Sequence, residues 1–286
     1  MKKRSNLLLS LMMAVAVLVF FGYCIIDRIN TDTVAPEIAM NTEKISVSVK
    51  DQQELLLNGV TANDDVDGDV TGSLVVESIY GIDDSHCATV VYAAFDSSGN
   101  VAKAERTVQY KDYKSPRFTL SRALAFETGS NFEVLDIVGA TDVIEGNIHR
   151  RVKATMLSNG SSVKEEGNHQ VQFQVTNSLG DTSQITLPIE VYPTDSFDAN
   201  LELSEYIIYL PKGSVFEPKD YLLGFTYRTE EFDLSEEIPE MFSVETEGTI
   251  NFSVPGVYPV SYTVKYTVDE DHSYVGYSKL IVVVEG

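Results

Sequence analysis

Short runs of alternating apolar and polar residues recur along the chain, and Gly, Asn, Asp and Pro separate them. This alternation has the period of two that is typical of strands with one buried face. After residue 26, no stretch keeps the 3.6-residue period of an amphipathic helix for long. The pattern therefore predicts an all-β protein, with strands at 45–49, 90–95, 104–110, 171–175, 183–191, 255–264 and 277–284.

A nine-residue motif occurs twice, at 62–70 and 140–148, and both copies read Ala-x-Asp-x-Val/Ile-Asp/Glu-Gly-Asp/Asn-Val/Ile. A repeat spaced by roughly 80 residues indicates an array of similar small domains. We expect three tandem immunoglobulin-like β-sandwiches preceded by one N-terminal transmembrane helix. The predicted domains are 32–112, 113–193 and a divergent, tyrosine-rich 194–286, in which only the closing hairpin of the repeat is recognisable.

The N-terminus combines basic residues at 2–4 with an apolar run at 7–26, which is long enough to cross a bilayer as a helix of about 20 residues. We expect 1–6 to be cytoplasmic and 7–26 to be a signal anchor, because positive charge stays inside. The alternatives are a cleaved signal peptide and a lipoprotein. Gly22-Tyr23-Cys24 fits neither cleavage pattern well. The chain is thus predicted to be a single-pass protein of the cell membrane with extracellular sandwiches.

The net charge limits the classes of partner that the chain can bind, and the cysteine content excludes an internal disulfide framework. The formal net charge is −22, which repels nucleic acid and anionic lipid and attracts cations or basic partners. Two cysteines, Cys24 and Cys87, cannot cross-link any single domain internally. Stability must therefore come from hydrophobic cores rather than from a disulfide framework.

Several segments together resemble a known class of module. They are Ala35-Pro36-Glu37-Ile38, 62–71, Tyr92 and 95–102. This combination is similar to the bacterial immunoglobulin-like modules of the DUF5011 and HYR types, most closely in the first domain. The resemblance implies a stalk, spacer or adhesive module of a secreted or wall-associated protein, and it supplies no catalytic residues.

The first copy of the motif places Asp64, Asp65, Asp67 and Asp69 around Gly68. Such a group suits a hard cation that takes six to eight oxygen ligands, and calcium is the natural candidate. No other cofactor is predicted. The alternative is a turn in which the aspartates accept hydrogen bonds from nearby backbone N–H groups. An EF-hand is excluded, because its glutamate and flanking helices are missing. The second copy offers less negative charge.

Enzymatic chemistry has weak support in the sequence. The four histidines, His86, His149, His169 and His272, are scattered and fit no triad or metal motif. His86 and His169 precede corresponding strands, where exposed edge positions are expected. Acidic pairs at 165–166, 230–231 and 236–237 resemble glycosidase acid–base pairs, but solvated loops explain them in so acidic a chain. The protein is predicted not to be an enzyme.

Tyrosine is concentrated in the predicted third domain, and Tyr206, Tyr209, Tyr227 and Tyr274 are the candidate partner-binding residues. The alternative is that they fill strand positions, which favour tyrosine. We expect a membrane-anchored surface protein in which a rod of sandwiches acts as a binding or adhesion module and the third domain contacts a protein, cell-wall or glycan partner. The alternatives are a structural or accessory subunit of an envelope complex and, more remotely, a wall hydrolase.

Overall fold

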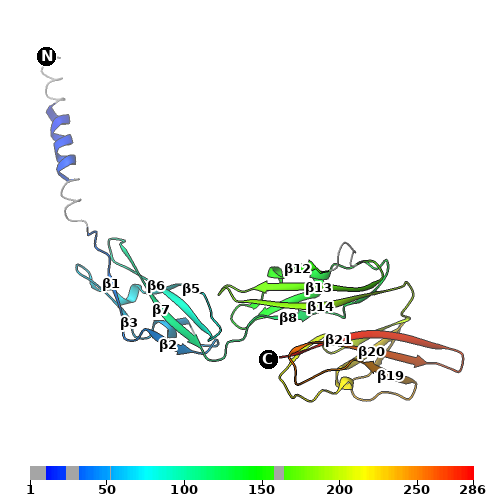
Figure 1. The fold of residues 1–286 in the computed structure, drawn as a ribbon. Coiled ribbons are helices and arrows are strands. Elements are labelled where there is room, and N and C mark those ends of the chain that lie inside the picture. The colour runs from blue at the N-terminus through cyan, green and yellow to red at the C-terminus, as the bar shows by residue number, and fades with distance from the viewer. Residues whose placement is uncertain (1–10, 24–31, 52, 158–163) are drawn as a thin grey trace, which may run out of the picture. The chain divides into compact units, whose positions relative to one another are not determined.

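A computed structural model describes residues 11–23, 32–51, 53–157 and 164–286. The chain forms two compact units, Met1–Asp112 and Tyr113–Gly286. Apart from a helical segment at 11–23 and short helical turns, the regular secondary structure of the described residues consists of strands (Figure 1), which confirms the all-β prediction. The boundaries of the three predicted domains stay predictions, because the second unit contains both the second and the third strand sets.

The predicted membrane anchor requires a correction. Within 7–26, residues 11–23 are helical, whereas 1–10, including the predicted cytoplasmic 1–6, and 24–26 lie outside the described residues. A bilayer-spanning helix needs about 20 residues. In the part of the chain that the structure describes, no helix is long and apolar enough to cross a membrane. The prediction of a single-pass membrane location is therefore wrong by this criterion.

The first unit is a sandwich of two sheets. One sheet has the order β1 (Glu37–Met40), β3 (Val60–Asp64) and β4 (Gly68–Asp69). The other has the order β2 (Lys44–Val47), β7 (Val101–Tyr110), β6 (Cys87–Phe95) and β5 (Val75–Tyr80). β2 pairs with β7 in parallel, whereas the other pairs are antiparallel. Short 3-10 turns, η1 (Gln53–Leu57) and η2 (Thr71–Ser73), connect the strands.

The second unit begins with the same plan. One sheet has the order β8 (Arg117–Leu120), β10 (Val138–Asp142) and β11 (Gly146–Asn147). The other has the order β9 (Ala125–Glu127), β14 (Thr182–Tyr192), β13 (Gly167–Thr176) and β12 (Lys153–Met156). β9 pairs with β14 in parallel, as β2 does with β7. The helical turns α2 (Val134–Ile137) and η3 (His149–Arg151) lie in the connections.

The third strand set forms a seven-stranded sheet. Its main path is β18 (Glu230–Asp233), β17 (Leu222–Tyr227), β15 (Ala199–Leu203), β21 (Ser273–Val284), β20 (Gly256–Thr267) and β19 (Phe242–Glu247). β16 (Ile207–Leu210) also pairs with β21 in parallel, and η4 (Pro218–Tyr221) precedes β17. The closing hairpin β20–β21 is the element that the sequence pattern predicted.

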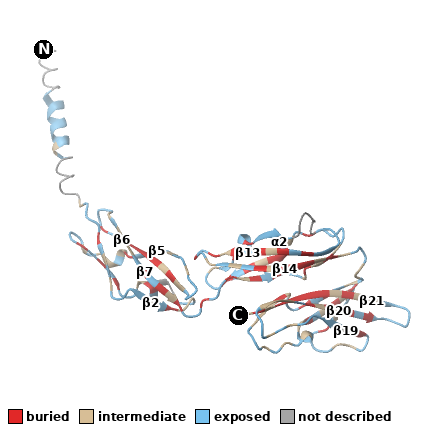
Figure 2. Ribbon diagram, viewed as in Figure 1, coloured by how far each residue is buried: buried red, intermediate tan, exposed pale blue. Residues whose placement is uncertain are grey.

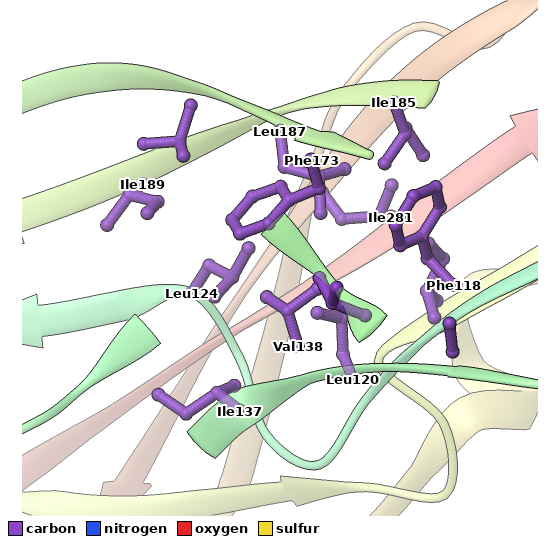
Figure 3. Close-up of a cluster of buried hydrophobic side chains, with 14 of the residues drawn as sticks. Phe118, Leu120, Leu124, Ile137, Val138, Phe173, Ile185, Leu187, Ile189 and Ile281 are labelled. Atoms are coloured by element: carbon purple, nitrogen blue, oxygen red, sulfur yellow. The ribbon is translucent and has the colours of Figure 1, made fainter. Parts of the chain in front are cut away.

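Buried side chains alternate along the long strands (Figure 2). In the second unit, Phe173, Leu187 and Ile189 gather with Phe118 and Val138 in one apolar cluster (Figure 3). Ile207 and Ile281 of the third strand set belong to the same cluster. The second and third strand sets of this unit therefore share a hydrophobic core.

Polar contacts also join the two sandwiches of the second unit. Lys279 is 2% exposed and forms an ion pair with Glu190. The Tyr277 hydroxyl donates to Glu190 Oε2 at 3.1 Å. Burial raises the pKa of Glu190, but the hydrogen bond from Lys279 leads the contacts that hold it below its usual value. Removing one partner of this pair should destabilise the contact between the two strand sets, because Lys279 is buried and its charge would be left unpaired.

Candidate functional site

Both copies of the motif build the same turn at the end of a strand. In the first unit, Asp64 Oδ1 accepts hydrogen bonds from the backbone N–H groups of Val66 and Asp67, both at 2.9 Å. In the second unit, Asp142 Oδ1 accepts them from Ile144 at 2.8 Å and Glu145 at 2.9 Å. The glycine of each turn, Gly68 or Gly146, has a φ of 72°, which favours glycine over other residues. The motif is thus in part a turn signal.

The sixth position of each motif, Asp67 or Glu145, connects this turn to the loop that follows β6 or β13. Asp67 accepts from the backbone N–H of Ser97 at 2.7 Å, and Glu145 accepts from that of Ser178 at 2.6 Å. Arg151 forms an ion pair with Glu145 as well. Burial raises the pKa of Glu145, but the hydrogen bonds from Arg151 and Ser178 lower it by more, so the pKa lies below its usual value.

The eighth position of each motif, Asp69 or Asn147, accepts a hydrogen bond from the first backbone N–H group of the following helical turn. Asp69 accepts from the backbone N–H of Thr71 at 3.0 Å, and Asn147 accepts from that of His149 at 2.9 Å. The hydrogen bonds from Thr71 hold the pKa of Asp69 below its usual value. Backbone capping therefore accounts for both residues without a ligand.

Three carboxylates from separate loops converge in the first unit, and we call Asp32, Asp64 and Asp96 the carboxylate group. One oxygen of each lies within 4.8 Å of the others. Asp64 is 3% exposed and Asp96 is 9% exposed. Oδ2 of Asp64 and Oδ2 of Asp32 are buried and have no hydrogen-bond partner among the described residues. Three negative charges thus meet in a largely buried place without a donor for two of their oxygens.

Asn100 is the polar neighbour of this group. Its backbone N–H donates to Asp96 Oδ1 at 2.8 Å, and its side-chain amide donates to Asp96 Oδ2 at 2.6 Å. The same amide reaches the backbone carbonyl of Asp32 at 3.2 Å. Burial raises the pKa of Asp96, but the hydrogen bonds from Asn100 outweigh it and lower that pKa, which keeps this carboxylate ionised.

The equivalent place in the second unit is a closed hydrogen-bond network. Asn177 stands where the first unit has Asp96, and its amide donates to Asp142 Oδ2 at 2.9 Å and to the Tyr113 hydroxyl at 2.7 Å. The Tyr113 hydroxyl in turn donates to Asp181 at 2.8 Å. Burial, followed by the bond to Asp181, raises the pKa of Tyr113. Here each of the two Asp142 oxygens has a protein donor.

The structure thus separates the four aspartates that the sequence singled out. It brings Asp64 together with Asp32 and Asp96, whereas Asp65, Asp67 and Asp69 lie outside the carboxylate group. Asp32 and Asp96 were missed, because they are far from the motif in sequence. One signal was available for Asp96: the matched turns 96–100 and 177–181 begin with Asp in one copy and Asn in the other.

The four candidate tyrosines contact other residues of the second unit, Tyr227 as a buried side chain and the other three as half-buried ones. The Tyr209 hydroxyl accepts from the backbone N–H of Phe118 at 2.8 Å, and burial raises its pKa to about 12. Tyr227 stacks on Tyr274 at 3.8 Å between ring centroids. Tyr206 packs against both buried clusters of this unit. Partner binding at these residues stays a prediction, and intramolecular packing accounts for the rings.

A cavity of about 230 Å³ lies between the second and third strand sets of the second unit, and we call it the inter-sandwich cavity. Its lining includes Arg122, Phe126, Phe197, Tyr206, Tyr277 and Ser278. Tyr206 is thus the one candidate tyrosine that lines it. Phe197 stacks on Tyr277 at 5.2 Å between centroids, and the Arg122 guanidinium lies 4.8 Å from the centre of the Phe126 ring. Aromatic faces and polar groups therefore share one cavity.

Two polar groups of the inter-sandwich cavity lack internal partners. Ser278 is 1% exposed, and its Oγ has no hydrogen-bond partner among the described residues. No carboxylate in the described ranges forms an ion pair with Arg122. The buried Ser278 hydroxyl therefore calls for a partner, and the exposed Arg122 guanidinium carries a charge that no carboxylate of the described residues pairs, so both can serve a ligand.

The histidines and acidic pairs lie apart from this cavity. His86 is exposed, as expected, but His169 is not at an exposed edge. It lies inside β13 at 5% exposure, and its ring Nε2 is 2.7 Å from the carbonyl oxygen of Glu165. The expectation for His169 was wrong because the strand begins earlier than the apolar pattern indicated. The acidic pairs at 165–166, 230–231 and 236–237 are exposed.

Comparisons with known proteins give distant structural likenesses only. No family model and no curated protein matches the chain, so membership of the DUF5011 or HYR type is not confirmed. The chain resembles mouse cadherin-23 EC22-24, with 12% identity, a TM-score of 0.21 and coverage of 88% of this chain and 99% of that one. It also resembles a Clostridium perfringens ZmpB structure with CBM51-2 and INT domains, at 14% identity and a TM-score of 0.22, covering 88% and 44% of the two chains.

A third likeness is to the protocadherin GammaB4 extracellular domain, at 9% identity and a TM-score of 0.20. The match covers 89% of this chain and 50% of that one, so this chain spans about half the length of that protein. At these TM-scores the likenesses carry no inference about function. What the structure shows is an all-β architecture of several sheets in which one parallel pairing recurs, β2 with β7, β9 with β14 and β16 with β21.

Proposed function

We propose that this protein is a non-catalytic binding module, and that the inter-sandwich cavity is its ligand site. The observation that carries the proposal is the combination, in one cavity, of aromatic rings, a buried Ser278 hydroxyl without a hydrogen-bond partner among the described residues, and an exposed Arg122 guanidinium that forms no ion pair with them. Ligand sites commonly lie at interfaces between domains and combine apolar walls with a few polar groups that fix orientation. The third strand set contributes Phe197, Tyr206 and Tyr277, in keeping with its expected role in partner contact.

The proposed ligand is one acidic sugar unit of a glycan. The cavity of about 230 Å³ is smaller than the roughly 300–1,000 Å³ of typical drug-sized sites, so it suits a single small unit. An arginine without an internal carboxylate partner favours a planar anion such as a sugar carboxylate. The rings of Phe197 and Tyr277 supply apolar surface for the sugar ring, whereas Phe126 is buried against Phe132 and lies under the Arg122 guanidinium.

The test compares D-glucuronate with D-glucose, which differ only in the carboxylate. Saturation-transfer NMR titrations of the full chain should show glucuronate binding at least about tenfold more tightly, a difference of about 1.4 kcal/mol. Arg122→Gln should abolish this preference. Arg150→Gln is the matched control, because Arg150 is exposed beside Arg151 and Lys153 in another hollow of the same unit.

Each outcome separates the alternatives. If Arg150→Gln rather than Arg122→Gln removes the preference, general attraction to the basic run 150–153 explains binding and the cavity proposal fails. If neither sugar shows transfer, the proposal also fails, and the alternative of a spacer or accessory subunit in a larger complex is favoured. A protein partner that competes with glucuronate only when Arg122 is intact would keep the site and change the ligand class.

A further inference from the structure

We infer that the carboxylate group of the first unit, Asp32, Asp64 and Asp96, is a calcium-binding site. Asp64 ends β3, Asp96 follows β6, and Asp32 lies in the segment before β1, so three separate loops supply the carboxylates. The site differs from the aspartate run of the motif, with which it shares only Asp64. It is also independent of the inter-sandwich cavity, which belongs to the other unit.

In both Asp64 and Asp32, one carboxylate oxygen accepts backbone hydrogen bonds and the other has no hydrogen-bond partner among the described residues. Oδ1 of Asp64 accepts two backbone N–H groups, and Oδ1 of Asp32 accepts the backbone N–H of Val34 at 2.9 Å. These bonds hold both carboxylates in place. Oδ2 of each is buried without a hydrogen-bond donor among the residues described. A buried carboxylate oxygen without a donor is costly, and a bound cation would satisfy it.

The second argument is geometry and charge. Two oxygens bound to one calcium ion at about 2.4 Å each lie at most about 4.8 Å apart, and the three carboxylates offer oxygens within 4.8 Å of one another. No Lys or Arg side chain of the described ranges forms an ion pair with any of them. The protein thus positions three anionic oxygen ligands and leaves the remaining coordination positions to water.

The third argument is the contrast with the second unit. Asp142 is held by the same two backbone bonds as Asp64, yet its Oδ2 accepts a hydrogen bond from Asn177. Where the structure uses this turn without a cation, an amide therefore fills the position that Asp96 occupies in the first unit. The first unit has a third carboxylate there instead, which serves a cation and is unfavourable without one.

Calcium fits this group better than magnesium. Calcium accepts six to eight oxygens in flexible geometry, whereas magnesium requires near-ideal octahedral geometry at 2.0–2.1 Å and retains its waters. Calcium affinities of extracellular modules lie at about 10⁻⁴–10⁻³ M, and we expect this class of affinity for three carboxylates on separate loops. Magnesium should bind at least about tenfold more weakly.

The experiment is calorimetric titration of the full chain with calcium chloride and magnesium chloride, combined with hydrogen–deuterium exchange in calcium and in chelator. We expect one calcium site, with slower exchange in peptides that cover 32–34, 64–70 and 96–100 and no change at 142–148. At saturating calcium, the unfolding transition of the first unit should rise by at least about 5 °C.

Asp64→Asn keeps the Oδ1 acceptor and should abolish binding, whereas the matched Asp142→Asn in the second unit should leave calcium binding unchanged. If Asp64→Asn does not fold, Asp32→Asn tests the same prediction at a less buried position. Calcium binding that persists in both Asp64→Asn and Asp32→Asn, or the absence of heat and protection in the unchanged chain, would overturn the proposal. Binding lost through Asp67→Asn or Asp69→Asn alone would move the site to the motif aspartates and overturn it as well.

Discussion

The two copies of the motif build one turn and use it differently. Asp64 and Asp142 each accept two backbone N–H groups through Oδ1, and both copies place a glycine with a φ of 72° four residues later. The difference lies at Oδ2. In the second unit an amide from Asn177 satisfies it, whereas in the first unit it has no hydrogen-bond partner among the described residues, and carboxylate oxygens of Asp32 and Asp96 lie close to the Asp64 carboxylate. The repeated residues therefore specify the turn, and residues outside the motif decide whether it can hold a cation.

The largest expected effect comes from making the second copy resemble the first by Asn177→Asp. The new carboxylate oxygen would replace an amide that lies 2.9 Å from Asp142 Oδ2, where both side chains are 6% exposed. Urea unfolding at pH 7 should show a loss of about 2–3 kcal/mol from the free energy of unfolding. The loss should shrink toward pH 4, because like charges raise the pKa of one carboxylate and protonation removes the repulsion.

Repeating the unfolding of Asn177→Asp in calcium tests whether the altered second site can bind the ion. Tyr113 rather than a third carboxylate completes the second site, so calcium should restore little of the stability that Asn177→Asp removes. Full recovery in calcium would mean that two carboxylates suffice and that Asp32 is not needed in the first unit. A loss below about 0.5 kcal/mol would show that the hydrogen bond between Asn177 and Asp142 contributes little.

A smaller effect of opposite sign is expected from Asp96→Asn, which makes the first copy resemble the second. The new amide removes one of three clustered charges and can donate to Asp64 Oδ2, with the Asn100 amide turning to accept from it. In chelator, the first unit should gain about 1 kcal/mol in the free energy of unfolding. In calcium, the variant should be less stable than the unchanged chain. Equal behaviour of the two proteins in both buffers would contradict the contrast drawn between the copies.

The sequence predicted the turn that both copies form better than it predicted the carboxylate group in which they differ. Alternating patterns at 90–95 and 171–175 indicated the strands β6 and β13, and the motif identified Asp64 and Asp142 as equivalent. Local spacing could not find the carboxylate group, because Asp32 and Asp96 reach Asp64 only through the sheet pairing of β1 with β3 and the packing of the two sheets. Local spacing also favoured Asp67 and Asp69, whose oxygens cap the backbone instead.

The aromatic residues show the same limit. Tyrosine enrichment pointed to the third strand set, but composition does not reveal which ring faces a neighbour within the chain. Tyr209 reaches the backbone of Phe118, and Tyr277 reaches Glu190, because the second and third strand sets of this unit share a core. Neither contact follows from a period-two pattern. For the same reason, Arg122 and Ser278, which line the inter-sandwich cavity, carried no signal in the sequence.

The smallest predicted effect concerns Glu145 and Asp67, which accept from equivalent serine N–H groups but differ in that Glu145 also pairs with Arg151. The folded-state pKa of Glu145 is lowered, since hydrogen bonds from Arg151 and Ser178 outweigh burial. Its contribution should therefore be present above the unfolded pKa of about 4.3 and disappear as the pH falls through the folded value. Glu145→Gln should cost at most about 1 kcal/mol at pH 7, because the pair is partly exposed, and nothing at pH 3.

Urea unfolding of the second unit at both pH values measures this, with Asp67→Asn in the first unit as the control that lacks an arginine partner. An equal cost of Glu145→Gln at pH 7 and pH 3 would mean that its shape rather than its charge supports the turn. The two copies would then differ in this position only by the length of the side chain, and the contrast between them would reduce to Asn177 against Asp96.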